Sequence, residues 1–391
     1  MRIWRPAVTF VELTEEPRFN LALILKGGDG MDRSPRWLAH GPHLAAPVPV
    51  TLEQLTLLQG VASNQPVEES ELVERLGEAQ VKALLAAGLL LSDDSADRVL
   101  ACDQASRDVA WWTPALVAQG GGAWSGVDIQ ARYETGMMPT SEALVEANGP
   151  VPVHEYRRRT DEDAIALASP QQGRFDELLA SRKTCRNFDD AGVLSASALA
   201  TMLRRVWGAI GTKEIAPGAI AVKKTSPAGG GMHAVEAYLL VQRAEGLAPG
   251  IYHYLPLRHA VEPLRIMSDA EAAALAYQLV AGQHWFANVP VMVIMTARFD
   301  RLFWKYRRHA KAWRVVHLDV GHLSQTMYLS AADLGLGAFV TAAINDHEAE
   351  VALGLEPMRE GAIALVGFGP RSGHRHNMEM DDLTPVEISR T

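Results

Sequence analysis

Lys305 and Tyr306 stand side by side in a basic and aromatic cluster, and a long apolar-faced segment follows them. In that segment, apolar residues recur at helical spacing from Val316 to Leu334, which predicts a buried helix over 311–334. A lysine at the edge of an apolar wall is a candidate general base, because burial and nearby cations lower an amine's pKa. An ordinary surface pair is the alternative interpretation.

A second cluster lies in the segment SRKTCRNF, where Arg182 and Arg186 flank the hydroxyl of Thr184. Guanidinium groups together with a hydroxyl donor suit a phosphate monoester. Further along, the segment LVGFGPRSG predicts a strand that ends in glycines, with Arg371 just beyond it as another cation. Arginine-rich loops are common, so these residues alone indicate only a possible anion site.

A third motif is the segment TSPAGGGMHAVEAYLLV, which places Ser226, Ala228 and Gly229 in a glycine-rich loop before a strand. Glycines let the backbone approach a flat ligand and point N–H groups at it. No Gly-Lys-Ser/Thr follows, and the loop precedes a strand instead of following one, so neither a Walker loop nor a dinucleotide fingerprint fits. An ordinary turn is the alternative.

The composition sets limits on the fold and on the partners. The chain has 391 residues, 48% hydrophobic and 21% charged, with a formal net charge of −9. This length favours two domains, and the negative charge argues against a nucleic-acid partner. Two distant cysteines predict neither disulfides nor a metal site, and no signal peptide or membrane span is recognisable. We therefore expect a soluble, cytoplasmic protein.

The first part of the chain has a pattern of its own. Residues 8–13 and 20–25 are predicted as strands, and three short helices are predicted within 52–87, the first capped by Thr51. This order resembles a winged helix, in particular the small domains that bind leader peptides, so residues 1–92 are expected to form a winged-helix or peptide-recognition-like domain. A helical lid or dimerisation arm is equally compatible. Residues 93–170 show little pattern and are predicted as a linker that wraps over the main domain.

From residue 171 onward, strand and helix patterns alternate regularly. Strands are predicted at 237–242, 250–254, 289–296, 337–342 and 362–369, and helices at 174–180, 196–210, 269–280, 311–334 and 346–353. This predicts an α+β sandwich, a mixed sheet flanked by helices, over 171–391.

Residues 174–370 resemble the nitroreductase superfamily of flavin oxidoreductases. The resemblance rests on the Arg-x-Thr-x-Arg motif, the Ser-Pro-x-Gly-Gly loop with its His and Glu, the helix GHLSQTMYLSAADLGLGA and the final VGFG strand. The Lys-Tyr pair and the segment GLAPGIYHYLP are similar to the SagB-type branch, which oxidises azolines in ribosomally made peptides. Ala228 and Ala234 depart from this pattern, because the family usually has Ser and Pro there.

The resemblance implies an FMN-dependent dehydrogenase that acts during peptide maturation, in a domain-exchanged homodimer. Lys305 and Tyr306 match the family's catalytic pair. The positions implied to contact FMN are Arg182, Thr184 and Arg186 at its phosphate with Arg371 beside them, Ser226, Ala228 and Gly229 in the loop, and Ala342 and Ala343 near its reactive edge. An NAD(P)H-dependent reductase of small molecules is the alternative, and a scaffold without cofactor is a third. No metal is expected. The peptide, the oxidised residue, the electron acceptor and any partner enzyme are not predicted.

Overall fold

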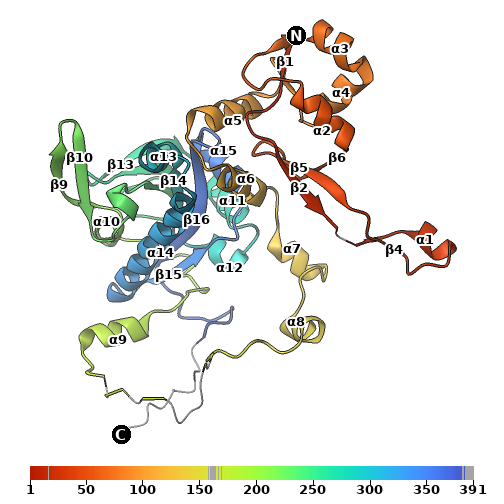
Figure 1. Ribbon diagram of the computed structural model, residues 1–391. Coiled ribbons are helices and arrows are strands. Elements are labelled where there is room, and N and C mark those ends of the chain that lie inside the picture. The colour runs from red at the N-terminus through yellow and green to blue at the C-terminus, as the bar shows by residue number, and fades with distance from the viewer. Residues whose placement is uncertain are drawn as a thin grey trace.

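The computed structural model describes residues 1–15, 17–156, 158, 164, 165, 167, 168, 170–380 and 383. Figure 1 shows a smaller N-terminal part in red and orange, and a larger part built around one central sheet. Helices α5 (Asp97–Asp108) and α6 (Thr113–Gly122) lie where the two parts meet. Within the described residues, no helix combines the length and the apolar character needed to cross a membrane.

The central sheet has six strands in the order β13-β12-β11-β14-β16-β15. They are β11 (Val235–Val241), β12 (Gly250–Leu255), β13 (Ala260–Ile266), β14 (Val291–Arg298), β15 (Gly337–Thr341) and β16 (Glu360–Gly369). Every pair in this sheet is antiparallel. The prediction of a mixed sheet, with both parallel and antiparallel pairs, was therefore wrong. Short connections join β11 to β12 and β12 to β13, and β16 lies between β14 and β15.

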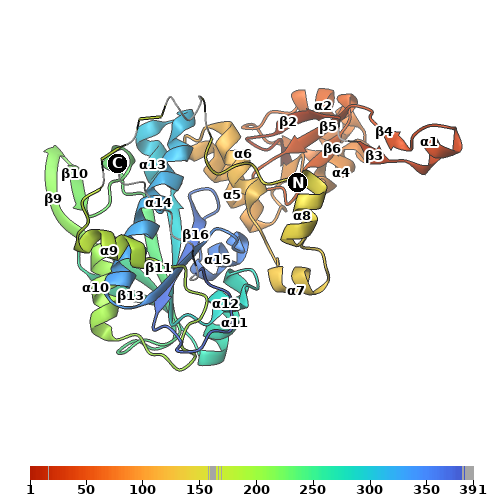
Figure 2. The same cartoon turned by 90° about the horizontal axis from the view of Figure 1, so that it is seen from below.

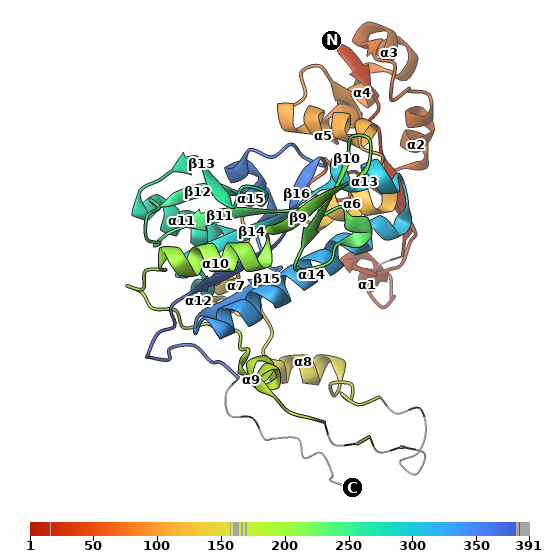
Figure 3. The ribbon, with the colours of Figure 1, turned by 90° about the vertical axis from the view of Figure 1, so that its left-hand side faces the viewer.

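Helices cover both faces of this sheet, so the predicted α+β sandwich is confirmed (Figure 3). Alternate residues of a strand point to opposite faces, and β14 shows this: Val293 joins one core cluster and Ile294 the other. The first face carries α10 (Ala196–Val206) and α14 (Ala310–Asp333). The second carries α11 (Asp269–Leu279), α12 (His284–Ala287) and α15 (Asp346–Leu353).

Residues 1–92 contain a small core of their own, centred on Ile3, Leu72 and Leu84. Three antiparallel strands, β7 (Val67–Glu68), β1 (Arg2–Trp4) and β8 (Leu91–Ser92), lie beside α2 (Leu52–Gln59), α3 (Glu69–Leu76) and α4 (Glu78–Ala86). Thr51 caps α2 in a capping box with Gln54, as the sequence predicted in part. Three short helices on a small sheet are what a winged-helix-like unit requires.

An arm extends from this part away from the rest of the molecule (Figure 2). It consists of β2 (Phe10–Thr14), β5 (Arg36–His40) and β6 (Val48–Val50), and then β3 (Arg18–Phe19), α1 (Leu21–Leu25) and β4 (Met31–Asp32) at its far end. The predicted strand at 20–25 was wrong, because Asn20 caps the turn of helix α1 by accepting a hydrogen bond from the Ala22 N–H.

In its described residues, the segment predicted as a linker contains four helices, namely α5 (Asp97–Asp108), α6 (Thr113–Gly122), α7 (Ile129–Glu134) and α8 (Ser141–Asn148). Trp111, between α5 and α6, packs against Phe299 and Phe303 at ring distances of 4.4 and 4.6 Å. Its indole N–H donates to the carbonyl oxygen of Met358. These contacts anchor α5 and α6 on the larger part of the molecule. Residues 157, 159–163, 166 and 169 of the segment lie outside the described residues.

Candidate functional site

Lys305 and Tyr306 end a short helix, α13 (Phe299–Tyr306), instead of introducing the long helix directly. Arg307 and Arg308 have positive φ angles of 21° and 55°, and His309 then caps α14. This break turns α13 so that Lys305 Nζ lies 2.7 Å from the carbonyl oxygen of Gly230 and donates a hydrogen bond to it. The Lys305 side chain is exposed, so this chain alone does not supply the apolar surroundings that the sequence suggested.

The glycine-rich loop is a tight turn (η2, Gly229–Gly231) that packs directly on protein side chains. Gly230 has a φ of 59°, and a Cβ atom there would lie 2.2 Å from the Tyr306 hydroxyl. A Cβ atom at Gly229 would lie 1.9 Å from a methyl group of Val315 in α14. The glycines are therefore required by close packing against α13 and α14, whatever else they contact.

Helix α14 holds this turn through two polar side chains on one face. Asp319 accepts a hydrogen bond from the Gly229 N–H at 3.0 Å, and Thr326 pairs with the Ser226 hydroxyl at 2.8 Å. Asp319 is buried, and desolvation raises the pKa of its carboxyl. The sequence analysis missed Asp319, although a carboxylate next to Val320 on an otherwise apolar helix face is a recognisable signal.

A buried lysine lies just before the turn. Lys224, the last residue of β10 (Ala219–Lys224), is only 8% exposed, and among the described residues its ammonium group makes no hydrogen bond or close ion pair. Desolvation lowers its pKa, while the Glu236 carboxylate opposes the shift. β10 forms a hairpin with β9 (Ala209–Ala216). The sequence analysis did not single out this lysine.

The predicted phosphate-binding residues gather near Tyr328, elsewhere on α14. Arg182, which follows α9 (Arg174–Ser181), lies over the Tyr328 ring at 5.3 Å, and the Thr184 hydroxyl is 3.1 Å from the Tyr328 hydroxyl. Within the part of the chain that the structure describes, the guanidinium groups of Arg182 and Arg186 have no carboxylate partner. Arg182 and the Thr184 hydroxyl, which meet at Tyr328, fit an anion, and Arg186 lies two residues further along the same segment.

Arg371 lies in the same region, but Glu379 already binds it. Arg371 donates to the Glu379 carboxylate at 2.6 Å. The same carboxylate accepts from the Arg186 backbone N–H at 2.6 Å and from the Asn187 side-chain amide at 3.0 Å. The side chain of Glu379 is 1% exposed, so this carboxylate neutralises the Arg371 cation inside the protein.

Ala342 and Ala343 follow β15 directly. Gln283 donates to the carbonyl oxygen of Ala343 at 2.7 Å and fixes this short segment. Ala342 lines a cavity of about 330 Å³ that also contacts Trp313 of α14 and Asp346, the first residue of α15. We call it the Trp313 cavity. Burial raises the pKa of Asp346 to about 6, although its carboxylate accepts a hydrogen bond from the Trp124 N–H.

The structure therefore places the predicted site residues in two groups. The first contains Arg182, Thr184, Arg186, Arg371, Ala342 and Ala343. The second contains Lys305, Tyr306, Ser226, Ala228 and Gly229. Tyr328 contacts the first group, and Thr326 contacts the second group. Side chains two residues apart on a helix point in directions that differ by about 200°. The two groups thus lie on nearly opposite sides of α14 in a single chain.

A protein-family model matches this part of the chain. The model of the nitroreductase family matches residues 179–370, a range that includes α14, the central sheet and all of the predicted site residues except Arg371, which follows it directly. Residues 179–370 belong to the nitroreductase family. This nitroreductase-family domain is the part of the chain in which the predicted fold is confirmed.

Three relatives each match a little less than half of the chain. MJ1384 of Methanocaldococcus jannaschii, provisionally named a nitroreductase, is 28% identical over 47% of this chain and 86% of its own length. The trifolitoxin-processing protein TfxB of Rhizobium leguminosarum is 29% identical over 41% of this chain and 42% of its own. The microcin B17-processing protein McbC of Escherichia coli is 24% identical over 47% and 65%. The match therefore spans less than two thirds of either processing protein.

Among solved structures, a chain of the E. coli microcin synthetase McbBCD complex, with truncated pro-MccB17 bound, overlays with a TM-score of 0.48. The overlay has 18% sequence identity and covers 72% of this chain and all of the other. At that score, the family membership rests on the sequence match.

Proposed function

We propose that this protein is an FMN-dependent dehydrogenase that oxidises a residue of a ribosomally made peptide, from azoline to azole or by a related desaturation. The observation that carries the proposal is that Lys305 and Tyr306 meet the glycine turn inside a nitroreductase-family domain. The similarity of this domain to two peptide-processing proteins supports a peptide substrate.

The residues present fit the cofactor. Arg182 and Arg186, with no carboxylate partner among the described residues, and the hydroxyl of Thr184 are suited to the phosphate group of FMN. Ala342 and Ala343 offer backbone groups in the same group of residues, whereas Arg371 could join only by sharing its charge with Glu379. When bound, FMN accepts the hydride that leaves the substrate carbon.

A homodimer completes the site in this proposal. The phosphate-binding group and the Lys305 group lie on nearly opposite sides of α14, so one FMN molecule would contact both only if two copies each contributed one group. Leu318, on the outer side of α14, is 55% exposed, which suits a contact with a second copy.

The chemistry assigned to Lys305 is removal of a proton. Aromatising an azoline removes one proton and one hydride from adjacent ring atoms, so the substrate loses two electrons. We assign the proton to neutral Lys305 and a hydrogen bond to the substrate to Tyr306. Bound FMN would supply the acceptor for the hydride, and dioxygen would be the simplest final acceptor of the two electrons, with hydrogen peroxide as product. Because Lys305 donates to Gly230 in this structure, it must leave that carbonyl and lose a proton before it acts.

The remaining parts of the chain have assigned roles in this proposal. Residues 1–92 would bind the leader segment of the peptide, residues 93–170 would connect and wrap, and residues 171–391 would carry the cofactor. Both cysteines, Cys102 and Cys185, are free and buried, which suits a reducing cytoplasm.

One variant each of Lys305 and Tyr306, with a control at Lys311, tests the base assignment. Lys305→Arg keeps a cation for the Gly230 carbonyl but cannot act as a base at neutral pH. We expect it to retain FMN and to lose at least about a hundredfold in peptide turnover, the range for general-base catalysis. Tyr306→Phe should lose less, and Lys311→Arg, at an exposed position on α14, should behave like the wild type. Full activity in Lys305→Arg would disprove the base role.

A reductase of small molecules fed by NAD(P)H is the second candidate, because the relative that matches over most of its own length is provisionally named a nitroreductase. Rapid bleaching of the flavin absorbance by NADH or NADPH, without any oxidation of azoline peptides, would favour it. Slow or absent bleaching, together with peptide oxidation, favours the dehydrogenase.

A further inference from the structure

Three cavities adjoin one short stretch of chain, residues 117–124, at the end of α6. The first, which we call the arm cavity, has a volume of about 310 Å³ and lies between this stretch and residues 40–47 of the N-terminal part. The second is the Trp313 cavity. The third, the junction cavity, has a volume of about 670 Å³ and is bounded by residues 42–45, α5, residues 120–127 and α15. Each is large enough for a ligand group, and such pockets commonly lie between domains.

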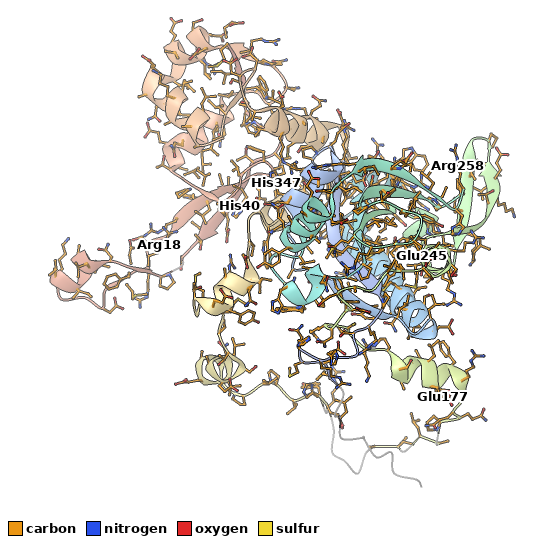
Figure 4. All side chains as sticks on the ribbon, turned by 180° about the vertical axis from the view of Figure 1, so that it is seen from behind. Arg18, His40, Glu177, Glu245, Arg258 and His347 are labelled. Atoms are coloured by element: carbon orange, nitrogen blue, oxygen red, sulfur yellow. The ribbon has the colours of Figure 1, made fainter. Side chains whose placement is uncertain are left out.

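These cavities share walls. Ala118 and Gly122 line both the arm cavity and the Trp313 cavity, while Ala123 and Trp124 line both the Trp313 cavity and the junction cavity. Residues 118–124, which form this shared wall, therefore lie between residues 40–47 of the N-terminal part and the Trp313 cavity, which Ala342 lines. In Figure 4, His40 of the arm cavity and His347 of the junction cavity are both labelled where the two parts of the molecule meet.

Hydrogen bonds and close packing hold both ends of residues 120–127, so this wall has its shape before a ligand binds. Residues 124–127 are fastened to the start of α15: Trp124 N–H donates to Asp346 at 2.9 Å, Gly126 N–H to Glu348 at 2.7 Å, and Val127 N–H to Asn345 at 2.9 Å. At the other end, Gly120 packs against Pro42, where a Cβ atom would come within 2.6 Å of the proline backbone.

The chemistry of the wall suits an extended peptide. Gly121 and Gly122 are exposed, and a Cβ atom at either would have no atom within 4 Å, so their backbone groups are accessible. They belong to the last turn of α6, where helix carbonyls lack partners within the helix and can accept N–H groups from a ligand. Trp124, 37% exposed, adds an aromatic surface. Backbone acceptors beside an aromatic ring bind a peptide chain with little demand on its sequence.

We propose that an extended peptide segment runs along Gly121–Trp124, from the N-terminal part to the Trp313 cavity, where the residue to be oxidised is received. The inference rests on the proposed function and adds to it the path of the substrate. Because the path is made mainly of backbone groups and small side chains, it accepts peptides of varied sequence and selects for an extended chain.

Gly122→Trp tests the path, since it fills shared wall space at a position where a Cβ atom has no neighbour within 4 Å and the backbone needs no positive φ. The probes are a long synthetic peptide with a central thiazoline and a short acetyl-thiazoline amide. Relative to the wild type, kcat/KM for the long peptide should fall at least about tenfold, an effect of the size expected when one binding contact is lost. The short amide and the FMN content should change little. Gly211→Trp, an equally open glycine in β9 that lines none of the three cavities, is the matched control.

The outcomes separate the two proposals. If the wild type and Gly122→Trp oxidise the long peptide equally well, the path is refuted while the dehydrogenase function stands. If Gly122→Trp slows the long and the short probe alike, the cavity serves small substrates and the peptide path is refuted. If the wild type oxidises neither probe, the proposed function fails and the path fails with it.

Discussion

Replacing Asp346 by Asn should make the stability of this protein less dependent on pH. Asp346 is the first residue of α15, where the positive end of the helix dipole would normally favour an ionised carboxylate. Burial has the larger effect here and raises its pKa from 3.8 to about 6, with the charges of Glu350 and Glu348 adding to the rise. The folded state therefore binds a proton more tightly than the unfolded state between these two pH values.

The sign and the size of the change in folding stability follow from this difference in pKa. Since the unfolded chain loses the proton first, folding stability falls as the pH rises through the window from 3.8 to about 6. The full difference in pKa corresponds to about 3 kcal/mol of folding free energy, at roughly 1.4 kcal/mol per pKa unit. About half of it, or roughly 1.5 kcal/mol, is expressed between pH 5 and pH 7.5. Asn is neutral throughout and keeps an oxygen to accept from the Trp124 N–H, so the variant should gain on the wild type by that amount over the same range.

Urea unfolding of the wild type and Asp346→Asn at several pH values between 5 and 7.5 measures this gain. Asp269→Asn is the matched control, because Asp269 is likewise the first residue of its helix, α11, but is exposed. It should show a difference from the wild type that hardly changes over this pH range. The reasoning is wrong if Asp346→Asn shows no pH-dependent gain, or if Asp269→Asn shows the same gain.

Two further predictions concern the cationic residues. Arg182→Gln should weaken FMN binding about tenfold to a hundredfold, because a charge-assisted hydrogen bond contributes roughly 1.5–3 kcal/mol; fluorescence titration with FMN measures this, and unchanged affinity, or an equal loss in the exposed control Arg174→Gln, would exclude the phosphate role. Lys224→Met should raise the urea midpoint at pH 7, and the gain should shrink as the pH rises toward 10.5, because burial lowers the pKa of Lys224 and the charged form opposes folding. Exposed Lys223→Met should show no such trend.

Most of the regular structure could be predicted because it has a regular pattern. The strand at 289–296 is one continuous apolar run of the length of a buried strand, and the helix at 311–334 repeats its apolar residues at the helix period; both are present within a few residues. Features fixed by one local contact were missed. The turn of helix at Leu21–Leu25 depends on a cap from Asn20, and the break after α13 falls on Arg307 and Arg308, which are not residues that usually end a helix.

The candidate site was predictable only where a motif is short in sequence. Arg182, Thr184 and the glycine turn could be found because their residues are neighbours in the chain. Glu379 could not, because it meets Arg371 and the Arg186 N–H only after the C-terminal segment folds back over the end of the sheet. Asp319 could have been recognised as an acid on an apolar helix face, but a single acid there gives no sign of which backbone group it binds.

The arrangement around the glycine turn sets a condition on the proposed mechanism. Lys305 binds Gly230, Asp319 binds Gly229, and Arg301 donates to the carbonyl oxygen of Met232 at 2.6 Å. The Ser226–Thr326 contact, Asp319 and Arg301 still hold the turn and the residues beside it when Lys305 moves away, so the lysine can leave without releasing the loop. Its exposed position means that the low-dielectric surroundings needed to favour the neutral amine must come from the bound cofactor, the substrate or a second copy of the chain. Base chemistry at Lys305 is therefore expected to arise only in the assembled complex.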